Sequence, residues 1–112
     1  MLFRSAAVYG SGSERLGAVL EQWRSVIGDG LSSIAAALPK KDLTGLADAA
    51  HRIKGSAGIA GAYAVSAEAA RLEAAAREGD LANVRESAQR LQAIAATALA
   101  EVADVLVRRR VG

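Results

Sequence analysis

The sequence lacks cysteine, has one proline and one histidine, and draws only 4% of its 112 residues from aromatic amino acids. Without cysteine there can be neither a disulfide framework nor a thiolate metal site. Because aromatics are scarce, alanine supplies much of the 52% apolar fraction. Alanine is the best helix former and a poor strand former, so this composition favours closely packed helices.

The chain also lacks a long apolar run and a strong excess of either charge. The most apolar segment, residues 94–107, is interrupted by Glu101 and Asp104, so no bilayer span is expected, and no secretory signal is found. Part of the formal net charge of +2 comes from Arg108–Arg110, too little to indicate nucleic-acid binding. We therefore expect a soluble, cytoplasmic protein that binds neither nucleic acid nor a membrane.

Apolar residues recur every three or four positions along four segments, which is the spacing of one buried face per helix. The helices are predicted over residues 13–38, 42–60, 62–78 and 80–110. Pro39 should end the first, since a proline pushes the residue before it out of helical geometry. Within that helix Gly28 and Gly30 predict a kink or break near Asp29, because glycine weakens a helix interior.

No segment alternates apolar and polar residues as a strand does. Helices with short connections and one apolar stripe each predict an all-α, antiparallel, up-down four-helix bundle. A further short helix is predicted at the N-terminus, before the flexible joint at residues 10–12. The length suits one domain covering residues 1–112, with the bundle core over about 13–107.

The single histidine lies on the second predicted helix. On a helical wheel of about 100° per residue, the core stripe of that helix includes Leu46, Ala50 and Ile53. His51 and Lys54 lie roughly 120° away from it, on a flank. A neutral imidazole is a nucleophile at cell pH, and Lys54, one turn later, can neutralise an anion attached to the ring.

Small residues share that flank with His51. Gly55 and Gly58 leave this flank without bulky side chains. A glycine inside a helix costs stability, so a steric requirement would explain its presence. Taken singly, each has an ordinary explanation: a satisfied partly buried histidine, a solvated surface lysine and helix-end glycines. It is their presence on one face that favours a site.

The segment from Ala49 to Gly58, followed by Gly61-Ala62, resembles the signature of histidine phosphotransfer (HPt) domains of bacterial two-component phosphorelays. That signature is a histidine, then Lys-Gly three and four residues on, then small residues ending in glycine. The resemblance continues at Leu72-Glu73 and at residues 77–80 and covers roughly residues 16–107.

The resemblance implies that His51 is phosphorylated on Nε2, that Lys54 steadies the phosphoryl group and that Gly55 admits the partner. It also implies that Glu73 contacts the other ring nitrogen, which would fix the tautomer. The expected docking surface is built around Ala47, Arg52, Gly55 and Gly58. One residue departs from this favourable picture: Asp48, one turn before His51, would repel a phosphoryl group.

The implied function is a phosphorelay intermediate that takes a phosphoryl group from a receiver-domain aspartate, or a kinase, and passes it to another receiver. The expected partners are response-regulator receivers or a hybrid histidine kinase, and the default oligomeric state is a monomer. We expect no cofactor and no bound metal, and no ATP site, since no P-loop sequence is present. Any Mg²⁺ would belong to the receiver.

Three alternatives belong to other classes. A helical interaction or scaffold bundle with a structural histidine would require only the apolar stripes, and a ring buried in the core would favour it. A hydrolase or metal enzyme is disfavoured because one histidine with scattered carboxylates forms no nucleophile–base set. A DNA-binding bundle is disfavoured because the basic residues are spread around the helices.

Overall fold

The computed structural model describes residues 14–60 and 62–111, and all four helices predicted for this part of the chain are present. They are α2 (Glu14–Lys40), α3 (Leu43–Ala60), α4 (Tyr63–Glu78) and α5 (Leu81–Val111). No strand occurs among these residues, so the predicted all-α class is confirmed. The short N-terminal helix expected before residue 13 lies outside the described residues.

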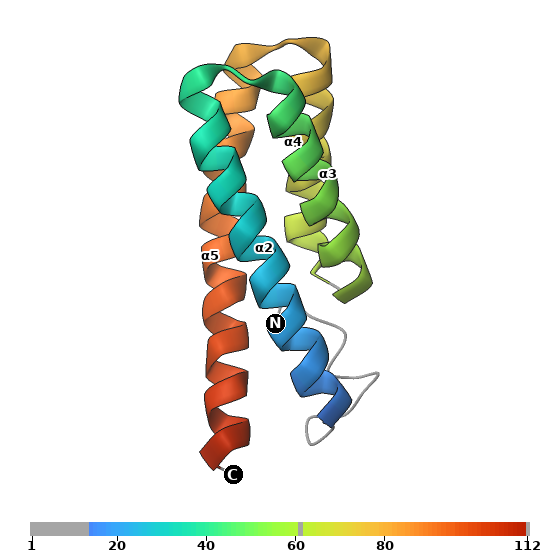
Figure 1. Ribbon diagram of the computed structural model, residues 1–112, viewed down its shortest axis with the longest axis vertical. Coiled ribbons are helices and arrows are strands. Elements are labelled where there is room, and N and C mark those ends of the chain that lie inside the picture. Colours follow the sequence, from blue (N-terminus) through green and yellow to red (C-terminus); the bar gives the residue numbers. More distant parts are fainter. Residues whose placement is uncertain (1–13, 61, 112) are drawn as a thin grey trace.

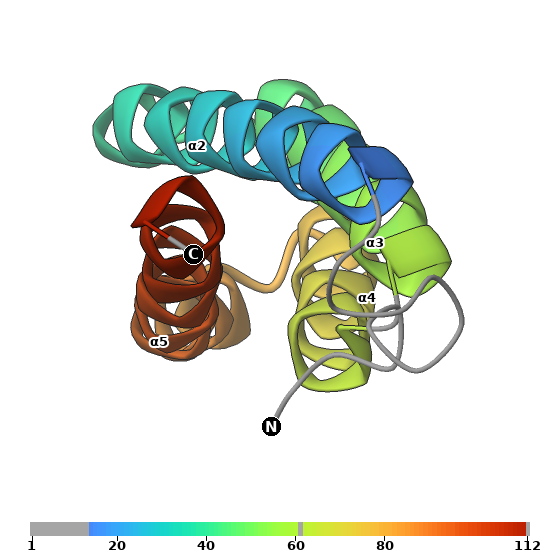
Figure 2. The same ribbon diagram turned by 90° about the horizontal axis from the view of Figure 1, so that it is seen from below.

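The four helices run alternately up and down and surround a common core (Figure 1). Viewed from below, α2 lies between α3 and α5, and α4 completes the ring on the other side (Figure 2). The molecule measures 46 × 21 × 17 Å. At about 1.5 Å per residue, the 31-residue α5 spans this length, whereas α3 and α4 cover only one half of it.

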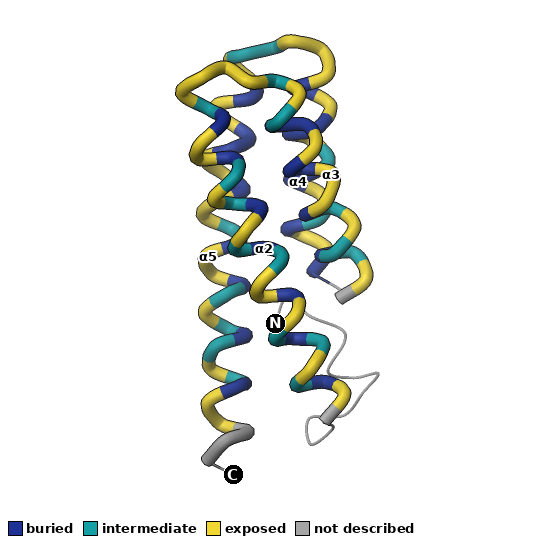
Figure 3. Tube along the Cα trace, in the orientation of Figure 1, coloured by how far each residue is buried: buried dark blue, intermediate teal, exposed yellow. Residues whose placement is uncertain are grey.

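Each helix buries one face, and the buried positions line the interior of the bundle (Figure 3). On α3 the predicted stripe is confirmed, since Leu46, Ala50, Ile53 and Ala57 are each 0% exposed. Alanine also occupies many core positions of α4 and α5, so the helix axes can approach closely. None of the described helices is both long and apolar enough to cross a membrane.

The turns at the upper end are formed by residues with specific backbone roles. Asp42 caps α3, because its Oδ1 accepts a hydrogen bond from the Gly45 amide at 3.0 Å. Gly79 ends α4 at φ 76°, a left-handed conformation that glycine adopts readily. Asp80 then caps α5 by accepting a bond from the Asn83 amide at 3.2 Å. These short connections keep consecutive helices antiparallel.

The predicted end of the first helix is wrong by two residues. Pro39 lies inside the last turn of α2, which ends at Lys40, and Lys41 follows with φ 54°. A proline near a helix end removes a single backbone hydrogen bond and can be accommodated there. The chain therefore reverses at Lys41 rather than at the proline.

The break expected near Asp29 does not occur, and α2 is one helix from Glu14 to Lys40. Gly30 has a packing role, since a Cβ there would lie 2.6 Å from Cγ1 of the buried Ile53. The glycine therefore lets α2 approach α3 closely at the level of the site. Gly28 has no such role, because a Cβ there would meet nothing within 4 Å.

A buried carboxylate connects α4 with α5. Glu68 is 2% exposed, and its Oε1 accepts bonds from Arg71 at 3.2 Å and from Arg90 of α5 at 3.1 Å. Arg90 also donates to Glu86 at 2.7 Å, so one guanidinium joins two acids. This cluster faces α5, so it is separate from the α3 flank that carries His51.

Candidate functional site

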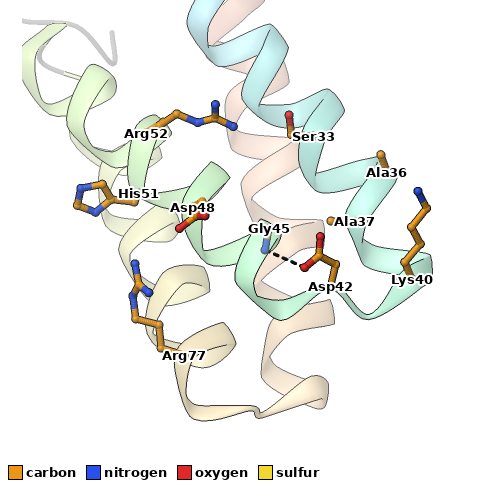
Figure 4. A pocket seen from close by; sticks show the side chains of 10 residues that line it. All are labelled: Ser33, Ala36, Ala37, Lys40, Asp42, Gly45, Asp48, His51, Arg52 and Arg77. Atoms are coloured by element: carbon orange, nitrogen blue, oxygen red, sulfur yellow. Dashed lines mark hydrogen bonds between the residues drawn. The ribbon is translucent and has the colours of Figure 1, made fainter.

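His51 lies on the outward flank of α3, with its side chain 62% exposed. Figure 4 shows the ring at the edge of the bundle, away from the α2 residues. This position follows from the helical wheel, since the stripe that contains Ala50 and Ile53 is the one turned inward. A side chain with this exposure is accessible to a protein that docks on α3.

Glu73 of α4 holds one nitrogen of the ring. Glu73 is only 8% exposed, and its Oε2 lies 2.9 Å from Nδ1 of His51. An ionised carboxylate can only accept a hydrogen bond, so Nδ1 carries the proton in this contact. In the neutral ring the free lone pair is then on Nε2, which is the nitrogen that can act as a nucleophile.

The carboxylate of Glu73 remains ionised over the whole physiological range. Its pKa is lowered from 4.5 to about 2, chiefly by the hydrogen bond from Lys54. Burial opposes this shift, while the hydrogen bonds from Arg77 and His51 add to it. The acceptor for Nδ1–H is therefore a permanent charge.

Two cations flank this carboxylate. Nζ of Lys54 donates to Oε1 at 2.8 Å, and Arg77 donates to Oε2 at 3.0 Å through a terminal nitrogen and at 3.3 Å through Nε. Both side chains remain partly exposed, at 38% for Lys54 and 56% for Arg77. Two cations around one anion give this part of the cluster a net positive charge beside the ring, which favours an incoming phosphoryl group.

The glycines after His51 differ in their surroundings. Gly55 is exposed, and a Cβ there would meet nothing within 4 Å. Gly58 is half-buried, and a Cβ there would lie at an ordinary 3.5 Å from the hydroxyl of Ser66. That hydroxyl donates to the carbonyl of Lys54 at 3.0 Å and so ties α3 to α4. Packing within the chain therefore does not require a glycine at position 55.

Two open grooves flank the N-terminal half of α3. The first, of about 640 Å³, lies between α2 and α3, and its lining includes Lys40, Asp48, His51, Arg52 and Arg77 (Figure 4). The second, of about 470 Å³, lies between α3 and the end of α4, and Ala47 and Arg77 line it. Arg77 thus borders both grooves and stands beside the ring.

The sequence model of the Hpt domain family matches residues 18–105, most of the chain. The chain belongs to the Hpt domain family. The resemblance inferred from the His51 segment is thereby confirmed, and the general role of the domain is phosphotransfer. The curated proteins and the solved structures gave no match to this chain.

In this Hpt domain the structure brings together His51, Lys54 and Glu73, which come from two helices. Arg52 and Gly55 are exposed on α3, and Gly58 is half-buried there. The expected place of Ala47 on the exposed docking surface is wrong, because Ala47 is buried, with only 1% of its surface exposed. Ala47 lies three positions before Ala50 on the helix and faces the α4 side. A partner could therefore contact it only at the edge of the second groove.

Sequence reasoning missed Arg77 as a site residue. The available signal was its spacing, since an arginine four residues after Glu73 on a helix lies on the same face as the glutamate. The structure adds no metal centre, because no group of three or more His, Asp or Glu side chains among the described residues is arranged to hold an ion.

Proposed function

We propose that this Hpt domain is a phosphorelay intermediate whose phosphoryl group is carried on Nε2 of His51. The observation that carries the proposal is the 2.9 Å contact between Nδ1 and Glu73 on a ring that is 62% exposed. One nitrogen is held as a donor by a permanent anion, so the other keeps its lone pair toward the accessible side. A histidine with only a packing role requires neither feature.

The transfer proceeds by in-line displacement. The Nε2 lone pair forms a bond to the phosphorus of a receiver's aspartyl phosphate, and the phosphorus–oxygen bond to the aspartate breaks. The electron pair of that bond leaves with the carboxylate. Nδ1 keeps its proton throughout, and the positive charge that develops on the ring is stabilised by Glu73. Passing the phosphoryl group to another receiver reverses these steps.

Lys54 and Arg77 assist from the two sides of Glu73. Each has donors besides those it gives the carboxylate, and each is partly exposed. They offset the negative charge of the phosphoryl group where it meets the anionic Glu73. The chain would carry a phosphoryl group made elsewhere, by a kinase or a hybrid kinase, and any Mg²⁺ would be held by the acidic pocket of the receiver.

The scaffold alternative would be favoured by a His51 ring buried in the core, and the ring has the opposite environment. No specific contact in the described part of the chain favours a hydrolase or a nucleic-acid binder. The phosphorelay role is therefore the single candidate that we carry forward.

The test is phosphotransfer from a panel of phosphorylated receivers. Wild type is expected to acquire an acid-labile, base-stable label, and His51→Gln is expected to acquire none, because His51 is the only histidine. Lys54→Ala, which retains the nucleophile, should be labelled more slowly. Equal labelling of wild type and His51→Gln, or no labelling of wild type by any receiver, would overturn the proposal.

A further inference from the structure

Two opposite charges without partners lie beside His51 in the groove between α2 and α3. Asp48 precedes the histidine by one turn, and Arg52 follows it directly. Both residues are exposed, and neither forms a hydrogen bond or an ion pair with another described residue. Small residues of α2 and α3 also line this groove: Ser33, Ala36, Ala37 and Gly45.

The absence of a bond between these two is unusual for this chain. An acid followed four residues later by a base on a helix can form an ion pair. The chain has four such combinations in its described helices, and three of them pair: Glu73 with Arg77, Glu86 with Arg90, and Asp104 with Arg108. The fourth is Asp48 and Arg52, and there the guanidinium points toward α2 instead (Figure 4).

Asp48 is unfavourable for the proposed chemistry when the domain is alone. A phosphoryl group carries about two negative charges at neutral pH, and the nearby carboxylate of Asp48 has no cation of its own, unlike that of Glu73. A docked protein changes this balance if it brings a positive side chain into the groove. The cost of Asp48 then becomes a requirement that only some partners meet.

From this arrangement we infer that Asp48 and Arg52 select the receiver, by pairing with a lysine or arginine and with an acidic side chain beside the receiver's phosphoaspartate. This inference rests on the proposed phosphorelay function. Charge pairs at an interface act mainly on the rate of productive encounter and on the rejection of wrong partners. A receiver with an acid facing Asp48 would be repelled where the phosphoryl group must pass.

The experiment compares two donors for each variant. The rate constant for phosphotransfer from each receiver of a panel is divided by the rate constant for labelling by potassium phosphoramidate, a small donor that needs no docking surface. Asp48→Lys is the test variant. Asp104→Lys, which makes the same change of charge on an exposed residue far along α5, is the matched control.

For the receivers that label wild type best, Asp48→Lys should lower this ratio at least tenfold, and Asp104→Lys should leave it unchanged. The loss should shrink at high salt, as expected for partly exposed charges. Replacing the exposed bases of one such receiver by glutamate, one at a time, should yield a variant that restores transfer to Asp48→Lys. Arg52→Glu should likewise be restored by an acid-to-lysine change on the receiver.

Equal ratios for wild type, Asp48→Lys and Asp104→Lys with every receiver would overturn the inference while leaving the phosphorelay role intact. A failure of that role looks different, because then no receiver labels wild type although phosphoramidate still does. That second result would overturn both.

Discussion

Glu73 connects three side chains of the site, since its one carboxylate accepts bonds from His51, Lys54 and Arg77. The arrangement makes a buried acid tolerable, because a carboxylate that leaves water needs hydrogen bonds and opposite charges to replace it. It also keeps the acceptor for Nδ1–H ionised near neutrality, because the pKa of Glu73 is lowered to about 2.

The depressed pKa of Glu73 predicts a pH-dependent stability. Folded and unfolded chains bind the same number of protons at this residue above its unfolded value of about 4.5, and the unfolded chain binds more between there and about 2. The free energy of unfolding should therefore fall as the pH drops through this window, by a few kcal/mol at most. Urea unfolding of wild type and Glu73→Gln between pH 2 and pH 6 measures it.

The difference between the two proteins isolates this residue from the other carboxylates. It should be largest above pH 4.5 and should decline toward pH 2. Two curves that remain parallel across this range would mean that Glu73 is not held ionised by its neighbours.

Residues of the site could be predicted to different degrees. The wheel of α3 alone put His51 and Lys54 on an outward flank, because the period of a helix fixes which residues share a face. Glu73 could be named only through the resemblance to the HPt family, since no local pattern relates residues on two helices. Arg77 was missed, although its contact depends on a simple spacing from Glu73.

At the scale of the helices, the glycines fall into two kinds: those that helix packing requires and those that it does not. Gly28 and Gly55 both lie inside helices, and a Cβ at either would meet nothing within 4 Å. Internal packing therefore explains neither. Gly55 differs in lying one turn after His51, on the flank where a receiver would dock.

Replacing each glycine by glutamine distinguishes the two. Both Gly28→Gln and Gly55→Gln should raise the free energy of unfolding by about 0.5 kcal/mol, because glutamine is the better helix former. Gly55→Gln should nevertheless slow transfer from a receiver at least tenfold, whereas Gly28→Gln should not. Chemical denaturation and the receiver assay give the two readouts, and equal transfer rates would remove the steric role of Gly55.

Gly30, in contrast, is required for packing, since α2 and α3 are in contact at this point. Gly30→Ala is expected to lower the free energy of unfolding by about 1–3 kcal/mol, the usual range for overpacking a core, because the new methyl meets Ile53. In an Ile53→Ala background the atoms it meets are absent, so the penalty should vanish. A double-mutant cycle in urea measures this coupling, and strictly additive effects would contradict it.

The element boundaries show where local sequence signals suffice. The cap and turn roles of Asp42, Gly79 and Asp80 depend on a few neighbouring residues, so local sequence can predict such boundaries. The local sequence did not predict that α2 continues through Gly28 and Gly30. Glycine weakens an isolated helix, but here one glycine is required for contact with α3, and that contact is not local.

At the scale of the molecule, α2 and α5 form a long frame, and the shorter α3 and α4 carry the site (Figure 1). His51 and Glu73 are 22 residues apart in sequence, and they meet because α3 and α4 pack antiparallel with alanines at many buried positions. The bundle architecture followed from four apolar stripes. The axial register of α3 against α4, which decides whether the ring meets the glutamate, did not follow from them.

The central claim is that Glu73 holds Nδ1–H and leaves Nε2 to carry the phosphoryl group. The most direct measurement is nuclear magnetic resonance of the domain with ¹⁵N-labelled histidine, after transfer from a phosphorylated receiver. We predict ¹⁵N–³¹P coupling at Nε2 of His51 and a retained proton on Nδ1. Phosphorus on Nδ1, or on a residue other than His51, would contradict the account.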